Sequence, residues 1–351
     1  MKNKSGIILV SLPFAAGVAA AALIDGPYPG AIICACAVPL LVFLCFKDNE
    51  RRPAAMYSLF FALGALCWCT DALSNVPRAP APSPAMDYLC GRIDGAGIPG
   101  EHSAAILKAL LTGRRSALDR SVIDIFRRSG ASHILALSGL HLGVLYIFVL
   151  TLLRPLGNSR PAKAVGSVVT VSLCGLYAYA TGASPSIVRA FLFILINETG
   201  KHFPGRRRSA LGTFCTALTI QLAIRPDFIS SVGFQLSYLA MLGITVLFPR
   251  LQKWYPSARG PSPLRYIWNC AALSISCQAF TAPVVWVHFR TFPKYFLITN
   301  LIAMPLTELL ISGSVAALLL DAAGLCPQWL ITACEKMVQL LEFCLETVAS
   351  I

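Results

Sequence analysis

The main pattern along the chain is a series of apolar runs separated by short polar or basic segments. Most runs contain roughly 18 to 25 residues, the length that an α-helix needs to cross the ~30 Å hydrocarbon layer of a bilayer. We predict spans at residues 6–24, 30–46, 54–73, 133–153, 164–181, 186–200, 209–224, 229–248, 266–288 and 295–319. A charged segment at 327–350 is expected to lie on the membrane surface or to cap the bundle. The pattern predicts an all-α polytopic membrane protein with about 10–11 transmembrane helices and an amphipathic helical segment on its outer face.

The composition supports this class. Hydrophobic residues make up 56% of the 351 residues, charged residues only 13%, and the mean hydropathy is +0.68. A soluble fold cannot cover so large an apolar fraction with so few charges. The 13 cysteines are scattered, and those within apolar runs have no histidine partners. We therefore expect buried small side chains there, and neither a metal site nor a cofactor.

Basic residues between the spans indicate the orientation. If the helices alternate, five basic segments lie on one side, namely Lys2 and Lys4; Lys47, Arg51 and Arg52; Arg154, Arg160 and Lys163; Lys201 and Arg206 to Arg208; and Arg250, Lys253, Arg259 and Arg265. The short loops opposite them carry only Arg225, Arg290 and Lys294. Because lysine and arginine are retained in cytoplasmic loops, this bias predicts a cytoplasmic N-terminus.

The segment between residues 74 and 130 then lies outside, although it holds eight basic residues. Its Pro- and Gly-rich first part predicts an irregular connection. Its second part, from Ser103 to Arg128, shows the periodicity of amphipathic helices and predicts a helical hairpin resting on the outer face of the membrane. We expect an outer basic patch formed by Arg114, Arg115, Arg127 and Arg128.

Polar residues interrupt the predicted span at 133–153. Ser138 and His141 are three residues apart and would share one face of a continuous helix, and His133 adds a titratable group at its outer end. Gly139 and Gly143 form a G-x-x-x-G notch that permits close helix packing. Two interpretations stay open: the glycines pack and the polar groups bond locally, or Ser138 and His141 line a polar path.

Three later stretches also carry polar groups into apolar spans. Ser184 and Arg189 follow a chain break in "TGASPSIVRA", and Arg189 would either reach the interface or face an anionic substrate. Gln235 lies in "VGFQLSYLA", where hydrogen bonding between helices is the alternative to substrate contact. Pro283, Asn300 and Pro305 are predicted to interrupt the last two spans, as in helices broken around transport paths. Pro283 and Pro305 are assigned to helix packing.

These four stretches, in this order, resemble the ComEC family of bacterial inner-membrane proteins that pass transforming DNA into the cytoplasm. The matching motifs are "SHILALSGLHL" at 132–142, "SPSIVRA" at 184–190, "GFQLSYLA" at 233–240, and a Gln, Pro and Phe series followed by "NLIAMPL" at 300–306. The resemblance covers roughly 103–310. It divides the chain into N-terminal helices at 1–74, an extracytoplasmic connection at 75–130, a competence-type transmembrane channel domain at 131–319 and a C-terminal helix at 320–351.

The resemblance implies translocation of single-stranded DNA across the bacterial inner membrane during natural transformation. His133, Ser138, His141, Ser184, Arg189, Gln235 and Asn300 would line the pore or contact DNA. Nothing in the sequence provides an outer OB-like domain or a metallo-β-lactamase-like metal cluster. Membrane lipid would surround the protein, and a separate DNA receptor, a nuclease and a cytoplasmic helicase-like ATPase are expected partners; a homo-oligomer stays open.

Two other classes of function stay open from the residues alone. One is a transporter of a small or lipid-linked solute. The other is an intramembrane serine hydrolase with Ser138 as nucleophile, which requires a base within hydrogen-bond reach. If Ser138 and His141 lie on one continuous helix, their side chains point in similar directions instead of toward each other. We therefore expect a protein that is not an enzyme and has no catalytic residues.

Overall fold

The protein is helical throughout the described regular structure. The computed structural model describes residues 5–23, 52–73, 84–95, 100–157, 159–202, 209–255, 263–290 and 295–350, and every regular element within them is a helix. Four described helical stretches are long and apolar enough to cross a membrane: Arg160–Ala180, Val232–Gln252, Leu264–Phe289 and Phe296–Ala322. Shorter apolar helices lie at Ile7–Leu23, Met56–Ala72, Gly139–Leu152 and Ala210–Ile224. The predicted all-α membrane class is confirmed; the predicted span at 30–46 lies outside the described residues.

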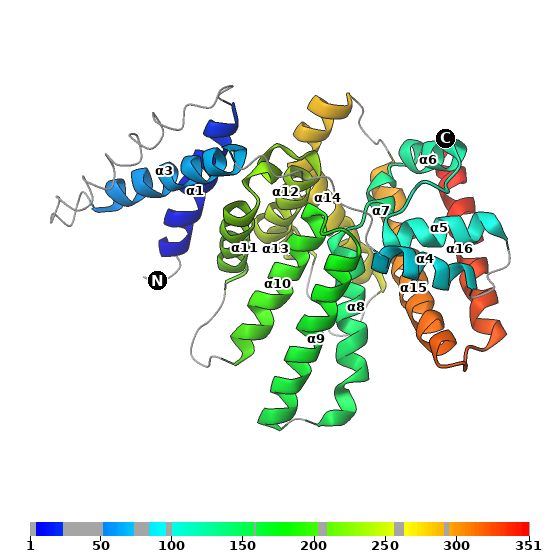
Figure 1. Cartoon of the computed structure of the whole chain (residues 1–351). Helices are drawn as coiled ribbons and strands as arrows, with labels where there is room; N and C mark the ends of the chain where they lie inside the picture. The colour runs from blue at the N-terminus through cyan, green and yellow to red at the C-terminus, as the bar shows by residue number, and fades with distance from the viewer. Residues whose placement is uncertain are drawn as a thin grey trace.

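The central bundle is an up-and-down array of helices (Figure 1). Its members are α8 (Gly139–Leu152), α9 (Arg160–Ala180), α10 (Pro185–Lys201), α11 (Ala210–Ile224), α12 (Val232–Val246), α13 (Phe248–Gln252), α14 (Pro263–Phe289) and α15 (Phe296–Ala322), with short 3₁₀ turns at Arg154–Leu156 and Pro226–Ser230. The Trp268 indole N–H donates to the Leu251 carbonyl over 3.0 Å, so α14 starts beside α13 and runs back along α12. Consecutive helices alternate in direction because short connections join packed neighbours.

Five of these helices form a closed ring of neighbours, here called the ring. α8 packs against α10, α10 against α12, α12 against α14, α14 against α15, and α15 against α8. α9 packs against α8 and α10, and α11 packs against α10 and α12. As a result of the alternation, α8, α10, α12 and α15 begin at the same end of the ring, here called the upper end, and α14 finishes there.

The first predicted span of the channel domain, at 133–153, is two helices. α7 (Ser132–Leu135) ends before an extended segment, and α8 begins only at Gly139. Ser138 has extended backbone angles (φ −115°, ψ 168°) and is the N-cap of α8. The prediction of one continuous helix was wrong because a cap within an apolar run leaves no trace in the periodicity.

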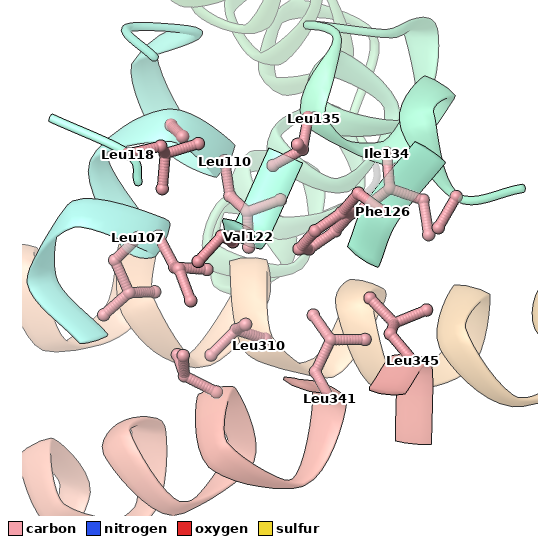
Figure 2. Close-up of a cluster of buried hydrophobic side chains, with 14 of the residues drawn as sticks. Leu107, Leu110, Leu118, Val122, Phe126, Ile134, Leu135, Leu310, Leu341 and Leu345 are labelled. Atoms are coloured by element: carbon pink, nitrogen blue, oxygen red, sulfur yellow. The ribbon is translucent and has the colours of Figure 1, made fainter. Parts of the chain in front are cut away.

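Five other described helices form an outer layer on the side of α15. They are α4 (Pro84–Gly95), α5 (Glu101–Thr112), α6 (Arg120–Arg128), α7 and α16 (Gln328–Ala349). Apolar side chains from α5, α6, α7, α15 and α16 meet in one buried cluster that includes Leu110, Phe126, Leu310 and Leu341 (Figure 2). Each of these four side chains is at most 1% exposed. The outer layer therefore has an apolar core of its own.

This layer corrects two expectations. Residues 84–95, predicted as irregular connection, form α4. α5 is not amphipathic, because nine of its twelve residues are buried between α4, α15 and α16. Only α6 keeps the expected amphipathic form, with Val122 and Phe126 buried and its arginines exposed. The segment 327–350 forms α16, which caps the bundle by packing on α15, α5 and α6.

The N-terminal helices α1 (Ser5–Leu23) and α3 (Arg52–Leu73) cross at two glycines. A Cβ at Gly17 would overlap the Phe61 carbonyl, and a Cβ at Gly64 would overlap the Phe14 carbonyl, so the backbones touch. Ser11 joins this pair to the bundle by donating to the Cys215 carbonyl of α11 over 3.1 Å. The Thr219 hydroxyl donates to the Ser11 hydroxyl over 2.8 Å.

Candidate functional site

The upper end of the ring carries the motif residues. His141, Arg189, Gln235 and Asn300 each lie within the first five residues of α8, α10, α12 and α15, respectively. These residues come from segments far apart in the sequence, and helix direction places them at the same end of the ring. Helix N-termini carry a partial positive charge, and four of them gather here, so this end favours negative charge before any side chain is considered.

The Ser138–His141 pair forms a reciprocal cap at the start of α8. The Leu140 N–H donates to the Ser138 hydroxyl over 3.3 Å, and the Ser138 N–H donates to His141 Nδ1 over 3.2 Å. The Ser138 Oγ and His141 Nδ1 atoms are 3.1 Å apart. The expectation that these side chains point in similar directions instead of toward each other was wrong, because Ser138 precedes the helix and turns back over it.

The cap also fixes the tautomer of His141. Because Nδ1 accepts a hydrogen bond from the Ser138 N–H, the proton of the neutral imidazole is on Nε2. His141 is only 2% exposed, and its Nε2 has no hydrogen-bond partner among the described residues. The five-helix ring therefore contains a buried N–H donor, on the His141 imidazole, that the fold does not use.

Arg189 is buried within the ring instead of reaching the interface. The reversal before α10 uses positive φ at Gly182 (80°) and Ala183 (49°), so that α10 begins at Pro185 and Arg189 follows about one turn later. The Arg189 side chain donates through Nη1 to the Ser237 carbonyl of α12. It is 9% exposed and forms no ion pair with a carboxylate in the described part of the chain.

Gln221, which sequence reasoning missed, links α11 to two ring helices. Its side-chain amide donates to the Pro185 carbonyl over 3.0 Å and accepts the Tyr238 hydroxyl over 2.8 Å. Gln221 is 1% exposed, and this network fixes the start of α10 against α12, next to Arg189. A glutamine inside the apolar run at 209–224 was the available signal.

Unpaired polar atoms concentrate at the motif positions. Among the described residues, five buried side-chain atoms lack a hydrogen-bond partner: His141 Nε2, Ser184 Oγ, Asn269 Oδ1, Gln278 Nε2 and Asn300 Oδ1. Four of the five belong to the stretches that the sequence singled out, and all five residues lie on ring helices or, for Ser184, at the N-cap of one. Since unpaired buried polar groups destabilise a fold, their concentration here points to a ligand or to water.

Other predicted residues behave differently. The Gln235 amide donates to the Ile229 carbonyl over 2.9 Å, so at least one of its donors is used locally. A Cβ on Gly139 would lie 3.3 Å from the Ala190 Cβ, which is close packing, whereas a Cβ on Gly143 would meet nothing within 4 Å. The G-x-x-x-G notch is therefore used at one glycine only.

The two prolines do not break their helices. Pro283 lies inside the 27-residue α14 and Pro305 inside the 27-residue α15. The predicted interruption of these spans was wrong, because a proline removes one backbone hydrogen bond while the rest of the helix can continue through it.

The predicted basic patch is only partly free. Arg114 pairs with Asp87 of α4 over 2.7 Å, and the Arg115 Nε donates to the Leu135 carbonyl over 3.2 Å. Arg127 and Arg128 are exposed in the last turn of α6. His133 is exposed on α7, with Nδ1 3.2 Å from the Gly130 carbonyl, and so it does not join His141 inside the ring.

A second polar cluster lies away from the upper end, toward the C-terminal end of α10. Glu198 is 1% exposed and accepts hydrogen bonds from Tyr146 of α8 (2.5 Å), Ser167 of α9 (2.7 Å) and Lys201 (2.5 Å). This cluster, which sequence reasoning also missed, is internally satisfied and ties three helices together. A glutamate inside the predicted span at 186–200 was its signal.

Comparison with known proteins supports the motif resemblance. The family model described as Competence protein matches residues 110–351. ComE operon protein 3 of Bacillus subtilis is 28% identical over 219 residues, which cover 62% of this chain and 26% of that protein. Recombination protein 2 of Haemophilus influenzae is 26% identical over 59% of this chain and 27% of that protein. Competence protein ComA of Neisseria gonorrhoeae is 25% identical over 60% of this chain and 30% of that protein.

The chain thus spans about a quarter to three tenths of the length of these relatives. No solved structure matches it. The family match begins within α5 and includes α16, so it covers the complete ring and most of the outer layer, and it extends beyond the motifs at 132–306. Because the match takes in more than half of the 351 residues, the chain belongs to the competence protein family.

Proposed function

We propose that this protein passes single-stranded DNA across the bacterial inner membrane during natural transformation, and that the strand crosses at the ring. The observation that carries this proposal is that the unpaired buried polar atoms lie on or cap five helices that close on one another, with those of His141, Ser184 and Asn300, together with the buried Arg189, at the upper end. Membership of the competence protein family supports DNA as the substrate.

The chemistry of the ring suits a strand that carries a negative charge at each phosphate. Burying an isolated charge in a low-dielectric environment is very costly, so a path needs donors along it. His141 Nε2–H, the Gln278 amide and the Arg189 guanidinium are donors, and none of them selects a base sequence when it bonds a phosphate. Distributed single donors also bind weakly enough for a strand to move on.

The orientation and the partners belong to the same proposal. The basic segments near Arg154, Lys201 and Arg250 lie at the end opposite the motif residues. We place that end, and the N-terminus, in the cytoplasm. A DNA receptor on the outside would then deliver the DNA, and a nuclease would convert it to a single strand. A cytoplasmic helicase-like ATPase would pull that strand inward. Reporter fusions at the loops after α8 and α9 test this orientation.

Uptake of labelled DNA tests the proposed function. In cells whose chromosomal copy is deleted, the wild-type gene should restore nuclease-resistant uptake and Arg189→Gln should not. The expected loss is about ten- to a hundredfold, the range for removing hydrogen bonds to a charged group, about 1.5–3 kcal/mol. The matched control is Arg160→Gln, because Arg160 is exposed at the start of α9.

Membrane levels of each variant must equal the wild-type level, as measured on blots of a tagged protein. If deletion leaves DNA uptake unchanged, the proposal is wrong, and transport of a small or lipid-linked solute becomes the function to test with labelled solutes.

We propose further that Ser138 caps α8 and is not a catalytic nucleophile. Its hydroxyl already serves the Leu140 N–H and His141 at the helix start. Ser138→Asn removes the hydroxyl nucleophile but retains a good N-cap side chain. We expect this variant to keep most of its DNA uptake, and Ser138→Leu to lose it; loss in both would favour catalysis.

A further inference from the structure

The Arg189 guanidinium joins the ring helices across their upper end. It extends from α10 and is hydrogen-bonded to the Ser237 carbonyl of α12. It also lies over Gly139 of α8, where a Cβ would be 2.9 Å from Nη2. α12 in turn packs on α14 so closely that a Cβ on Gly243 would overlap the Ser276 carbonyl, next to Cys277. One side chain therefore joins three of the five ring helices, and α12 connects them to a fourth.

The guanidinium is held by a neutral partner that can be given up. Inside α12 the Ser237 carbonyl is also positioned to accept the helical N–H four residues later, so it stays satisfied when Arg189 leaves it. Arg189 itself cannot leave without a replacement acceptor, because an unpaired cation buried in a low-dielectric environment is strongly disfavoured. A phosphate oxygen is a better acceptor than a carbonyl and can bond the guanidinium with two parallel hydrogen bonds.

We propose that Arg189 is a phosphodiester-binding gate, which exchanges the Ser237 carbonyl for a phosphate of the incoming strand. In the closed ring the guanidinium fastens α10 to α12 and fills the space above Gly139. When a phosphate accepts the hydrogen bonds of the guanidinium, α12 is no longer held to α10 and water reaches Cys277. This inference rests on the proposed function and adds how the ring distinguishes a polyanion from other solutes: only an anion supplies the acceptor that opens it.

Cys277 is a built-in reporter of this opening. It is half-buried on α14, next to the contact with α12, whereas Cys174 of α9 is fully buried in a different cluster and reports general loosening of the bundle. The experiment uses the full chain in lipid vesicles and a membrane-impermeant methanethiosulfonate, with the modification of each cysteine quantified by peptide mass spectrometry. The probe is a single-stranded oligonucleotide whose binding is measured in parallel by crosslinking.

We expect bound oligonucleotide to raise the modification rate of Cys277 about tenfold, a population shift of about 1.4 kcal/mol, while Cys174 stays unchanged. In Arg189→Gln, Cys277 should react fast without DNA and should not respond to it. Inorganic phosphate at the same phosphate concentration and vesicles of anionic lipid without DNA should both give a smaller response. An equal response to either would overturn the assignment to the strand.

A pair of glycine variants tests the gate independently of Arg189→Gln, which could misfold. Gly139→Ala places a methyl group against the guanidinium and should open the ring to the reagent without DNA. Gly143→Ala, one helical turn later on α8, meets nothing within 4 Å and should behave as wild type. If Cys174 becomes reactive together with Cys277 in Gly139→Ala, the bundle has loosened and the gate is rejected.

The failure of the gate and that of the proposed function are distinguishable. If the wild-type protein binds the oligonucleotide and supports DNA uptake in cells but Cys277 does not respond, only the gate is overturned. If the oligonucleotide does not bind and the deleted strain takes up DNA normally, the proposed function fails and the gate with it.

Discussion

The ring and the outer layer bury their side chains by opposite rules. In the outer layer, Phe126, Leu110 and Leu341 pack in an apolar cluster and are each at most 1% exposed. Its charged groups form pairs near the surface, such as Arg114 with Asp87 and Arg92 with Asp321. The ring instead contains a buried arginine without a carboxylate and most of the unpaired polar atoms of the described chain.

The difference indicates where stability and function lie. Apolar burial contributes about 1.5–3 kcal/mol for each large side chain, so the outer layer is a source of stability. Unpaired buried polar atoms each cost about 1–3 kcal/mol, so the upper end of the ring gives up stability. The unpaired groups at four motif positions are the ones to which the proposed function assigns a role.

Phe126→Ala should have the largest effect on stability. Removing a fully buried phenylalanine from the outer layer leaves a cavity, with an expected loss of about 3–5 kcal/mol. Thermal unfolding in detergent measures it, and Phe343→Ala on α16 is the control because Phe343 is 66% exposed. Equal melting temperatures for the two variants would mean that the outer layer does not stabilise the protein.

Asn300→Leu should separate stability from function. The Asn300 side-chain oxygen has no described partner, so replacing the amide by an apolar group of similar shape should leave stability unchanged or raise it by about 1 kcal/mol. DNA uptake should nevertheless fall severalfold. Asn269→Leu removes another unpaired oxygen, on α14 near its start, and should leave uptake intact. Uptake that falls equally in both variants would argue against a site at the upper end.

Arg92→Ala should have the smallest effect. Arg92 of α4 donates to Asp321 of α15 over 2.6 Å, but both side chains are partly exposed (36% and 27%). The loss should be under about 1 kcal/mol and should disappear at high salt, since exposed ion pairs are screened. Unfolding at low and high salt, compared with Arg127→Ala, provides the measurement. A salt-independent loss would show that this pair stabilises the outer layer by packing.

Much of the architecture could be predicted because a bilayer imposes simple rules on the sequence. Apolar length identified the long helices α9, α14 and α15, and polar residues within apolar runs identified His141, Arg189 and Asn300 as unusual. Their placement at one end of the ring could not be derived from composition or periodicity. It follows from the alternating directions of the helices, which place the starts of α8, α10 and α15 at one end.

The errors share a physical cause. Ser138 caps a helix through its own side chain, and Arg114 is neutralised by Asp87 from a separate helix; neither contact leaves a periodic signal. The burial of α5 was missed because alanines such as Ala105 and Ala109 are only weakly hydrophobic. The face that they occupy does not look apolar in the sequence, yet it is buried. Sequence patterns report which side of an element is apolar, and contacts between distant elements decide the rest.

The crossing of α1 and α3 sets an order for assembly during synthesis. These two helices meet backbone to backbone at Gly17 and Gly64 and can pair as soon as both have left the ribosome. Their anchor is distant, because Ser11 bonds a carbonyl 204 residues later in the chain. At about 5–20 residues per second, synthesis of the roughly 140 residues from the end of α3 to Cys215 takes about 7–28 s, and the pair waits that long in the membrane for α11. The N-terminal pair is therefore an early module that must remain stable in lipid alone until the bundle reaches it.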